Sequence, residues 1–134
     1  MEATVGIIGA GNFGTAIADL VASNGSPTRL WMRDEEILKD IQEHNENVRY
    51  LPGHKLDKNI HPTTNLEFAA QSAVLFVTVP SASFRSVSRD LSNYISLDAC
   101  VISATKGVEA NEDASGFKLM SQILEEELAT SRIG

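Results

Sequence analysis

The sequence has few of the features that mark secreted or membrane-spanning chains. Its 134 residues include one cysteine, Cys100, so no internal disulfide can form. Cys100 lies in the apolar stretch ACVISAT, where we expect a buried strand thiol. No apolar run reaches the roughly 18 residues of a membrane span, and the N-terminus lacks the pattern of a signal peptide. These absences predict a cytoplasmic protein that does not act on membranes.

Positive charge is scarce as well. Eleven lysines and arginines stand against 18 acidic residues, which gives a formal net charge of −7. Nucleic acids and anionic membranes attract basic surfaces, so the composition predicts neither as a partner. The three histidines, His44, His54 and His61, show no metal-ligand spacing, and one cysteine cannot complete a zinc site with them. We therefore expect no metal, and any bound phosphate must be held by local dipoles and a few placed cations.

What is present is an alternation of strand-length apolar runs with segments of helical period. This pattern is typical of an α/β fold, with a doubly wound, mostly parallel sheet covered by helices on both faces. At 134 residues the chain is expected to be one domain. Strands are predicted at 3–9, 28–33, near Ile60, at 73–80 and at 99–107, and the most apolar of them, 73–80, should be central. Helices are predicted from Gly11 to Asn24 and over 34–45, 64–71, 81–95 and 115–130.

Apolar spacing also assigns a buried face to each longer helix. In chain order the expected buried residues are Phe13, Ile17, Leu20 and Val21; Ile37, Leu38 and Ile41; Phe84, Val87 and Leu91; and Phe117, Met120, Ile123, Leu124 and Leu128. Thr64 or Asn65 is expected to cap the short helix over 64–71, and Ser81 the next one. The irregular stretch 47–63 should be a long loop, and such loops are often functional.

Three glycines, Gly9, Gly11 and Gly14, directly follow the first predicted strand and open the first predicted helix. In that setting the spacing is the fingerprint of a dinucleotide site: Gly9 makes the tight turn, Gly11 lets the backbone approach a pyrophosphate, and Gly14 lets helix and strand pack closely. The positive end of the helix then faces the anion. The alternative is a tight turn with no ligand.

The end of the second strand should discriminate between dinucleotides. An acidic residue about 20 positions past the last glycine commonly holds the ribose of NAD, whereas an arginine accommodates the 2′-phosphate of NADP. Asp34 stands at that position, with Arg33 beside it. Asp34 can equally be the cap of the following helix, and Arg33 a solvated charge. We assign the adenosine end to Arg33 and expect NADPH to be accepted.

Lys106 follows a buried strand at the sheet edge where open α/β folds bind their ligands. A cation there could contact a substrate phosphate or the nicotinamide end of the cofactor. Pro80 and Ser81 end a neighbouring strand and are expected to line the same crevice, unless they serve only as strand stop and helix cap. No residue is clearly placed to exchange a proton with a substrate oxygen.

Six stretches together resemble the N-terminal half of bacterial-type NAD(P)-dependent glycerol-3-phosphate dehydrogenase: GAGNFGTAIA, LWMRD, NVRYLPGHKL, VTVPS, ISATKGVE and MSQILEEEL. The resemblance spans residues 5 to 128, and YLPG and TKG are its most specific parts. It implies a Rossmann-like domain of an enzyme that interconverts dihydroxyacetone phosphate and sn-glycerol 3-phosphate with NADH or NADPH, for phospholipid synthesis.

The resemblance also implies roles for individual residues. Asn12 and Phe13 match cofactor-contacting positions, Arg33 the residue beside the adenosine, and Tyr50 a residue of the loop near the cofactor. Lys106 matches a lysine shared by cofactor and substrate phosphate. Family members often have tryptophan or tyrosine where Phe13 stands, so a hydrogen bond from that ring is lost here.

Family members continue into a helical second domain that carries the catalytic lysine and most substrate contacts. Residues 1–134 are accordingly expected to be the NAD(P)-binding domain alone, with no catalytic residue and little activity. Apolar surface exposed without that second domain would favour a homodimer. The alternatives are a non-catalytic dinucleotide-binding module and another Rossmann dehydrogenase, for example one acting on hydroxyacids, which YLPG and TKG together disfavour.

Overall fold

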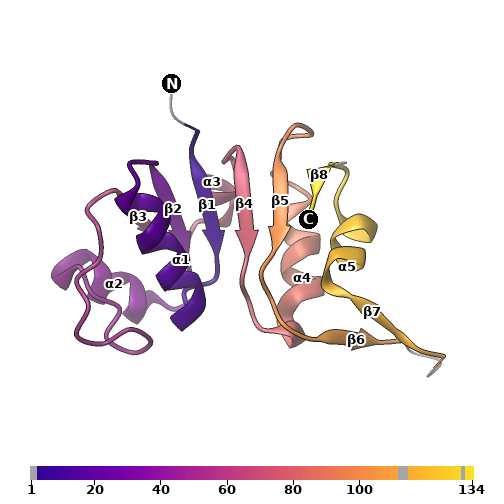
Figure 1. Cartoon of the computed structure of the whole chain (residues 1–134), viewed down its shortest axis with the longest axis horizontal. Coiled ribbons are helices and arrows are strands. Elements are labelled where there is room, and N and C mark those ends of the chain that lie inside the picture. Colours follow the sequence, from indigo (N-terminus) through magenta and orange to yellow (C-terminus); the bar gives the residue numbers. More distant parts are fainter. Residues whose placement is uncertain (1–2, 112–114, 131) are drawn as a thin grey trace.

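The computed structural model describes residues 3–111, 115–130 and 132–134 and shows a six-stranded parallel sheet with helices on both faces (Figure 1). The strand order is β3-β2-β1-β4-β5-β8. The strands are β1 (Val5–Ile8), β2 (Thr28–Trp31), β3 (Ile60–Thr63), β4 (Val74–Val77), β5 (Cys100–Ser103) and β8 (Arg132–Ile133). The helices are α1 (Asn12–Ser23), α2 (Glu35–His44), α3 (Leu66–Ala70), α4 (Ser81–Leu91) and α5 (Met120–Glu127). A separate antiparallel hairpin joins β6 (Val108–Ala110) to β7 (Phe117–Leu119).

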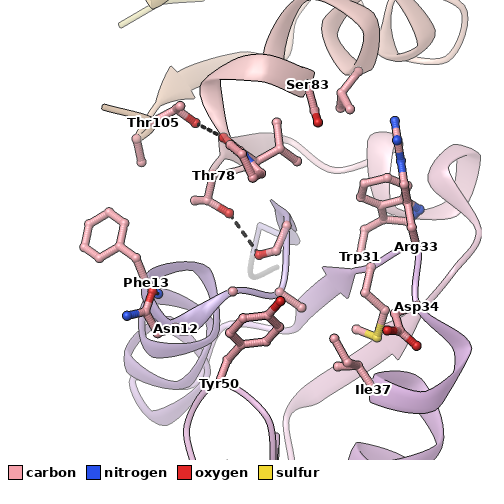
Figure 2. Close-up of a pocket in the computed structure, with 18 of the residues that line it drawn as sticks. Asn12, Phe13, Trp31, Arg33, Asp34, Ile37, Tyr50, Thr78, Ser83 and Thr105 are labelled. Carbon is pink, nitrogen blue, oxygen red and sulfur yellow. Dashed lines mark hydrogen bonds between the residues drawn. The ribbon is translucent and has the colours of Figure 1, made fainter. Parts of the chain in front are cut away.

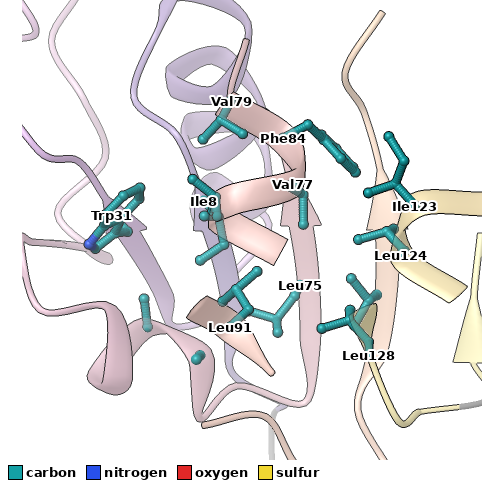
Figure 3. Close-up of a cluster of buried hydrophobic side chains, with 14 of the residues drawn as sticks. Ile8, Trp31, Leu75, Val77, Val79, Phe84, Leu91, Ile123, Leu124 and Leu128 are labelled. Carbon is teal, nitrogen blue, oxygen red and sulfur yellow. The ribbon is translucent and has the colours of Figure 1, made fainter. Parts of the chain in front are cut away.

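Alternate residues of the central strands feed two hydrophobic cores, one on each face of the sheet. Ile7 and Leu30 belong to the core under α1 and α2, whereas their neighbours Ile8 and Trp31 belong to the core under α3, α4 and α5. Figure 3 shows this second core, in which Phe84 of α4 lies beside Ile123 of α5. Strands buried on both faces explain the nearly continuous apolar runs of the sequence. The predicted doubly wound α/β fold is confirmed.

Most predicted elements and buried faces are confirmed. The strand predicted at 73–80 is β4, which pairs with β1 and β5 inside the sheet. Asn65 caps α3, since its side chain accepts a hydrogen bond from the backbone N–H of Phe68. The cap predicted for α4 is wrong: the N-cap is Pro80, and Ser81 is the first helical residue. Cys100 lies in a strand as expected but is only half-buried.

The buried face predicted for α1 is wrong for Phe13 and Leu20, whereas Ile17 and Val21 are half-buried and pack against the core as expected. Phe13 and Leu20 are 57% and 63% exposed, and the residues that face the sheet are small: Gly14, Thr15, Ala18 and Ala22. The reason is the close approach of α1 to the glycine turn, because a Cβ atom built on Gly14 would lie 2.0 Å from the carbonyl oxygen of Gly9. A large side chain does not fit at that contact, so small residues line it, and Phe13 and Leu20 lie on the outer side of the helix.

The helix predicted over 115–130 is also wrong in its first part. Residues Phe117–Leu119 form β7, which pairs with β6 and leaves Phe117 65% exposed, and only Met120–Glu127 is helical. Gly116 has a φ of 151°, a backbone conformation that favours glycine and precedes the strand. Among the described helices, none combines the length and apolar character required to cross a membrane.

Candidate functional site

A cleft of about 780 Å³ opens at the carboxyl edge of the sheet, a volume within the usual range for small-molecule sites. Its walls come from residues that follow β1, β2, β4 and β5, strands that all run parallel. The chain after β1 crosses to β2 on one side, and β4 pairs with β1 on the other. Open α/β sheets bind ligands at such a switch point.

The glycine turn forms the floor of the cleft. Gly9 has a φ of 125°, which permits the sharp turn after β1. The Thr78 hydroxyl donates to the Gly9 carbonyl oxygen at 2.9 Å and to that of Ile8 at 3.1 Å, which fixes the turn against the end of β4. At Gly11 a Cβ atom would meet no other atom within 4 Å, so the space above this residue is open to a ligand.

The amino ends of two helices face this space. The N-cap of α1 is Gly11, which has no side chain to cap the helix, and the N-cap of α4 is Pro80, which makes no side-chain hydrogen bond. Both residues line the cleft. Helix amino ends present backbone N–H groups and a positive dipole, which suit an anion such as a pyrophosphate. The residues present therefore fit the phosphate part of a dinucleotide.

The opposite wall carries an aromatic ring and charged groups. Figure 2 shows Trp31, Arg33 and Asp34 across the cleft from Asn12 and Phe13, with Tyr50 between the two sides. The Trp31 indole N–H donates to the Thr64 carbonyl oxygen at 3.1 Å, which holds the ring in place. The exposed Arg33 guanidinium lies 5.8 Å from the centre of that ring. This wall offers a flat surface and a cation.

Asp34 acts as a helix cap here. One carboxylate oxygen accepts the backbone N–H of Glu36 at 2.8 Å, and the other accepts the guanidinium of Arg49 at 2.6 Å. The Glu36 N–H, followed by Arg49, holds the pKa of Asp34 below its usual value. Both oxygens therefore have a partner, which favours the capping role over contact with a ribose.

The segment after β5 brings a second cation to the cleft. The Thr105 hydroxyl donates to the carbonyl oxygens of Val79 at 2.7 Å and Val77 at 3.2 Å, so the ends of β4 and β5 are joined. Lys106 is exposed and lines the cleft, and Gly107 follows it with a φ of 112°. The lysine thus lies where it can reach a bound molecule.

The structure brings nearly all the predicted cofactor residues together. Lining the cleft are Gly9, Gly11, Asn12, Phe13, Arg33, Tyr50, Pro80 and Lys106. Gly14 lies behind the turn, where its missing side chain permits the helix contact. Among the residues 3–111, 115–130 and 132–134, no group of three or more histidine, cysteine, aspartate or glutamate side chains could hold a metal ion.

Sequence reasoning missed the polar residues that hold these walls in place, namely Asn47, Arg49, Thr78 and Thr105. Thr78 interrupts the apolar run AVLFVTVP, and Thr105 stands directly before Lys106, so each had a weak local signal. Asn47 and Arg49 had none, because their partners Ala10 and Asp34 are far away in the sequence.

Comparison with known proteins decides the family. The family model for the N-terminus of NAD-dependent glycerol-3-phosphate dehydrogenase matches residues 4–134. The chain belongs to this family. The match confirms the resemblance seen in the sequence and rules against another Rossmann dehydrogenase. A glycerol-3-phosphate dehydrogenase (NAD(P)+) of Teredinibacter turnerae is 47% identical over 131 residues, and one of Saccharophagus degradans is 46% identical over 132.

Solved structures agree with this family assignment. The glycerol-3-phosphate dehydrogenase of Saccharomyces cerevisiae superposes with a TM-score of 0.89 at 27% identity, over 100% of this chain and 41% of that chain. The Teredinibacter match covers 97% of this chain and 37% of the relative, and the Saccharophagus match 98% and 36%. The chain thus corresponds to little more than a third of these glycerol-3-phosphate dehydrogenases. The names of both bacterial relatives give NAD(P)+, in agreement with the expected NAD or NADP cofactor.

Proposed function

We propose that residues 1–134 are the cofactor-binding domain of an oxidoreductase that interconverts dihydroxyacetone phosphate and sn-glycerol 3-phosphate with NAD(P)H, for glycerophospholipid synthesis. The observation that carries the proposal is a single cleft that combines the open glycine turn, two helix amino ends and Lys106 in a chain of this family. The helical substrate domain of the whole enzyme would lie outside these 134 residues.

The proposal gives each group of the cleft a task. The backbone at Gly11 and Asn12 and the amino end of α4 hold the pyrophosphate, while Trp31 and Arg33 receive the adenosine. Tyr50 lies between the two sides, and Lys106, after β5, attracts the phosphate of the substrate. When bound, the nicotinamide supplies the hydride. No group of this chain is assigned the proton transfer, which falls to the rest of the enzyme.

The charges of the adenosine wall favour NADPH. Both carboxylate oxygens of Asp34 already accept hydrogen bonds, and the charge of Arg49 compensates that of the carboxylate, so Asp34 opposes a nearby 2′-phosphate less than a free carboxylate would. No carboxylate of the described residues forms an ion pair with Arg33. The Arg33 guanidinium lies on the same wall of the cleft as Asp34, near the Trp31 ring. A guanidinium without an ion pair, beside a carboxylate already paired with Arg49, suits a 2′-phosphate.

The proposal also includes the expected location of the enzyme, its partners and its oligomeric state. The enzyme would work in the cytoplasm, on a small phosphorylated substrate and without nucleic acid or membrane. The exposed apolar side chains of α1 and of the β6/β7 hairpin would favour association of two copies of the chain.

The test is a titration of the chain with NADPH and NADH, followed by calorimetry and by thermal unfolding. Binding to the folded state raises the midpoint temperature by linkage. We expect both cofactors to bind, NADPH more tightly, and Arg33→Ala to weaken NADPH by about tenfold while NADH changes little. Lys58→Ala, which removes an exposed cation away from the cleft, is the matched control. Absence of binding by both cofactors would contradict the proposal.

A further inference from the structure

The loop between α2 and β3 runs along α1 and is attached to it at three points. Next to the glycine turn the attachment is the Asn47 side chain. At mid-helix, Asp19 accepts the backbone N–H of Asp57 at 2.7 Å and contacts His54 at 2.7 Å. At the far end, the Asn59 amide donates to the Ala22 carbonyl oxygen at 3.1 Å. Only the first attachment lies beside the cleft.

Asn47 is 0% exposed, and both the nitrogen and the oxygen of its side-chain amide have hydrogen-bond partners. Its nitrogen donates to the Ala10 carbonyl oxygen and to the Thr15 hydroxyl, both at 2.9 Å. Its oxygen accepts the backbone N–H of Tyr50 at 3.2 Å. One buried side chain thus joins the glycine turn, the first turn of α1 and the loop.

The two segments that Asn47 joins form separate walls of the cleft. Ala10 belongs to the glycine turn, and Tyr50 and Arg49 belong to the loop, and all three line the cleft. Asn47 does not line it. The backbone N–H of Leu51 also donates to the Asn47 carbonyl oxygen at 2.8 Å, so the turn that presents Tyr50 is built on this residue.

We propose that Asn47 is a positioning residue for the cofactor: without touching it, Asn47 holds the Tyr50 loop at the distance from the glycine turn that a dinucleotide requires. This inference rests on the proposed function. It is specific to Asn47, since the attachments at Asp19 and Asn59 hold parts of the loop that do not line the cleft. Loss of Asn47 leaves the loop tied to α1 and, through Arg49 and Asp34, to the start of α2, but removes the link between its cleft end and the glycine turn.

The experiment compares Asn47→Ala with two controls at a temperature where each protein is fully folded. Asn59→Ala removes the far attachment of the same loop. Thr130→Val removes a buried hydroxyl that donates to the Ala99 carbonyl oxygen at 2.6 Å, outside the cleft, and so controls for lost stability. The readouts are the dissociation constant for NADPH and the hydrogen exchange of the Tyr50 and Leu51 amides.

We expect Asn47→Ala to weaken NADPH by about tenfold or more and to speed exchange at both amides, while the controls stay within about twofold for NADPH. If Asn47→Ala binds NADPH as tightly as the unchanged chain, or if Thr130→Val weakens it equally, the inference is wrong. Should Asn47→Ala fail to fold, Thr15→Val removes one partner of the amide, and its NADPH affinity must then fall by about threefold. Failure of the unchanged chain to bind NADPH would instead overturn the proposed function.

Discussion

The Tyr50 loop and the β6/β7 hairpin are both additions to the edge of one sheet, yet they differ in the buried or charged groups that hold them. The loop is attached to the glycine turn by the uncharged amide of Asn47, which is fully buried, and to the start of α2 by the exposed pair of Arg49 with Asp34. The hairpin is attached by charges, mainly those of Arg85 on α4, which pairs with Glu109 of β6 at 2.7 Å. Arg85 also pairs with Glu127 of α5 at 2.8 Å.

The two faces of the hairpin differ in kind. Its pairing places Val108 opposite Leu119 and Ala110 opposite Phe117, so these exposed apolar residues share one face. The pair between them, Glu109 and Lys118, lies on the other face, toward the carboxylates and arginines of α4 and α5. Figure 1 shows the hairpin extending away from the sheet.

The comparison indicates how each addition should respond to its surroundings. Hydrogen bonds of a buried neutral amide are insensitive to salt and change little with pH, whereas ion pairs at the surface weaken under both influences. The attachment of the loop to the glycine turn through Asn47 should therefore depend less on salt and pH than the hairpin attachment, whereas the Arg49–Asp34 pair shares the sensitivity of the hairpin. Substitutions that act on one region alone can test this separation.

The largest effect is expected from Gly14→Ala. The added Cβ atom would lie 2.0 Å from the Gly9 carbonyl oxygen, which is backbone and cannot move aside, so α1 must shift. We expect a loss of roughly 3 kcal/mol in the free energy of unfolding, measured with urea, together with loss of NADPH binding.

Gly11→Ala is the matched control for this change. Its Cβ atom meets nothing within 4 Å, so the free energy of unfolding should fall by only about 0.5 kcal/mol. The methyl group would still occupy the space proposed for the pyrophosphate, so NADPH binding should weaken. Equal stability of the two variants would contradict the role given to Gly14.

A smaller effect is expected from Arg85→Met, which removes the central charge of the hairpin attachment. The side chain is 25% exposed, so its pairs lie between surface and buried ones, and we expect a loss of about 1–2 kcal/mol. NADPH affinity should not change, because Arg85 does not line the cleft. A loss of affinity comparable to that of a cleft variant would show that the two regions are coupled.

The same network predicts a dependence on pH. Arg85 lowers the pKa of Glu109, and Arg89, followed by Arg85, lowers the pKa of Glu127, from an ordinary value of 4.5. A carboxyl whose pKa is lower in the folded state stabilises the fold above the unfolded value and loses that contribution as pH falls. Urea unfolding at about pH 7 and about pH 4 should therefore show an acid loss that is smaller in Arg85→Met. An equal loss in both proteins would contradict this account.

The fold could be predicted where local pattern and tertiary contact agree. The runs that became β1 and β4 pack against both cores, so their sequence alone indicates them. The outward position of Phe13 could not be predicted, because it follows from the contact between Gly14 and Gly9. Phe117 was misplaced for a similar reason, since the pairing of β6 with β7 overrides its helical spacing.

The site residues that could be predicted are those marked by the glycine spacing or by a position directly after a predicted strand. Gly9, Arg33 and Lys106 follow buried strands, and parallel strands bring such residues to one edge. The sequence left open whether Asp34 caps a helix or binds a ribose. The position of Arg49, which binds one carboxylate oxygen, favours the cap. Asn47 is a polar residue within a loop, and its burial depends on contacts with Ala10 and Thr15, more than 30 residues away.

The central claim is that the cleft binds a dinucleotide between the glycine turn and the adenosine wall, independently of the hairpin. The most direct measurement is hydrogen exchange of the chain with and without saturating NADPH. The account predicts slower exchange at residues 9–15, 31–34, 47–51 and 104–106, and unchanged exchange at 108–110 and 117–119. Protection confined to the hairpin, or none in the cleft while NADPH is bound, would contradict it.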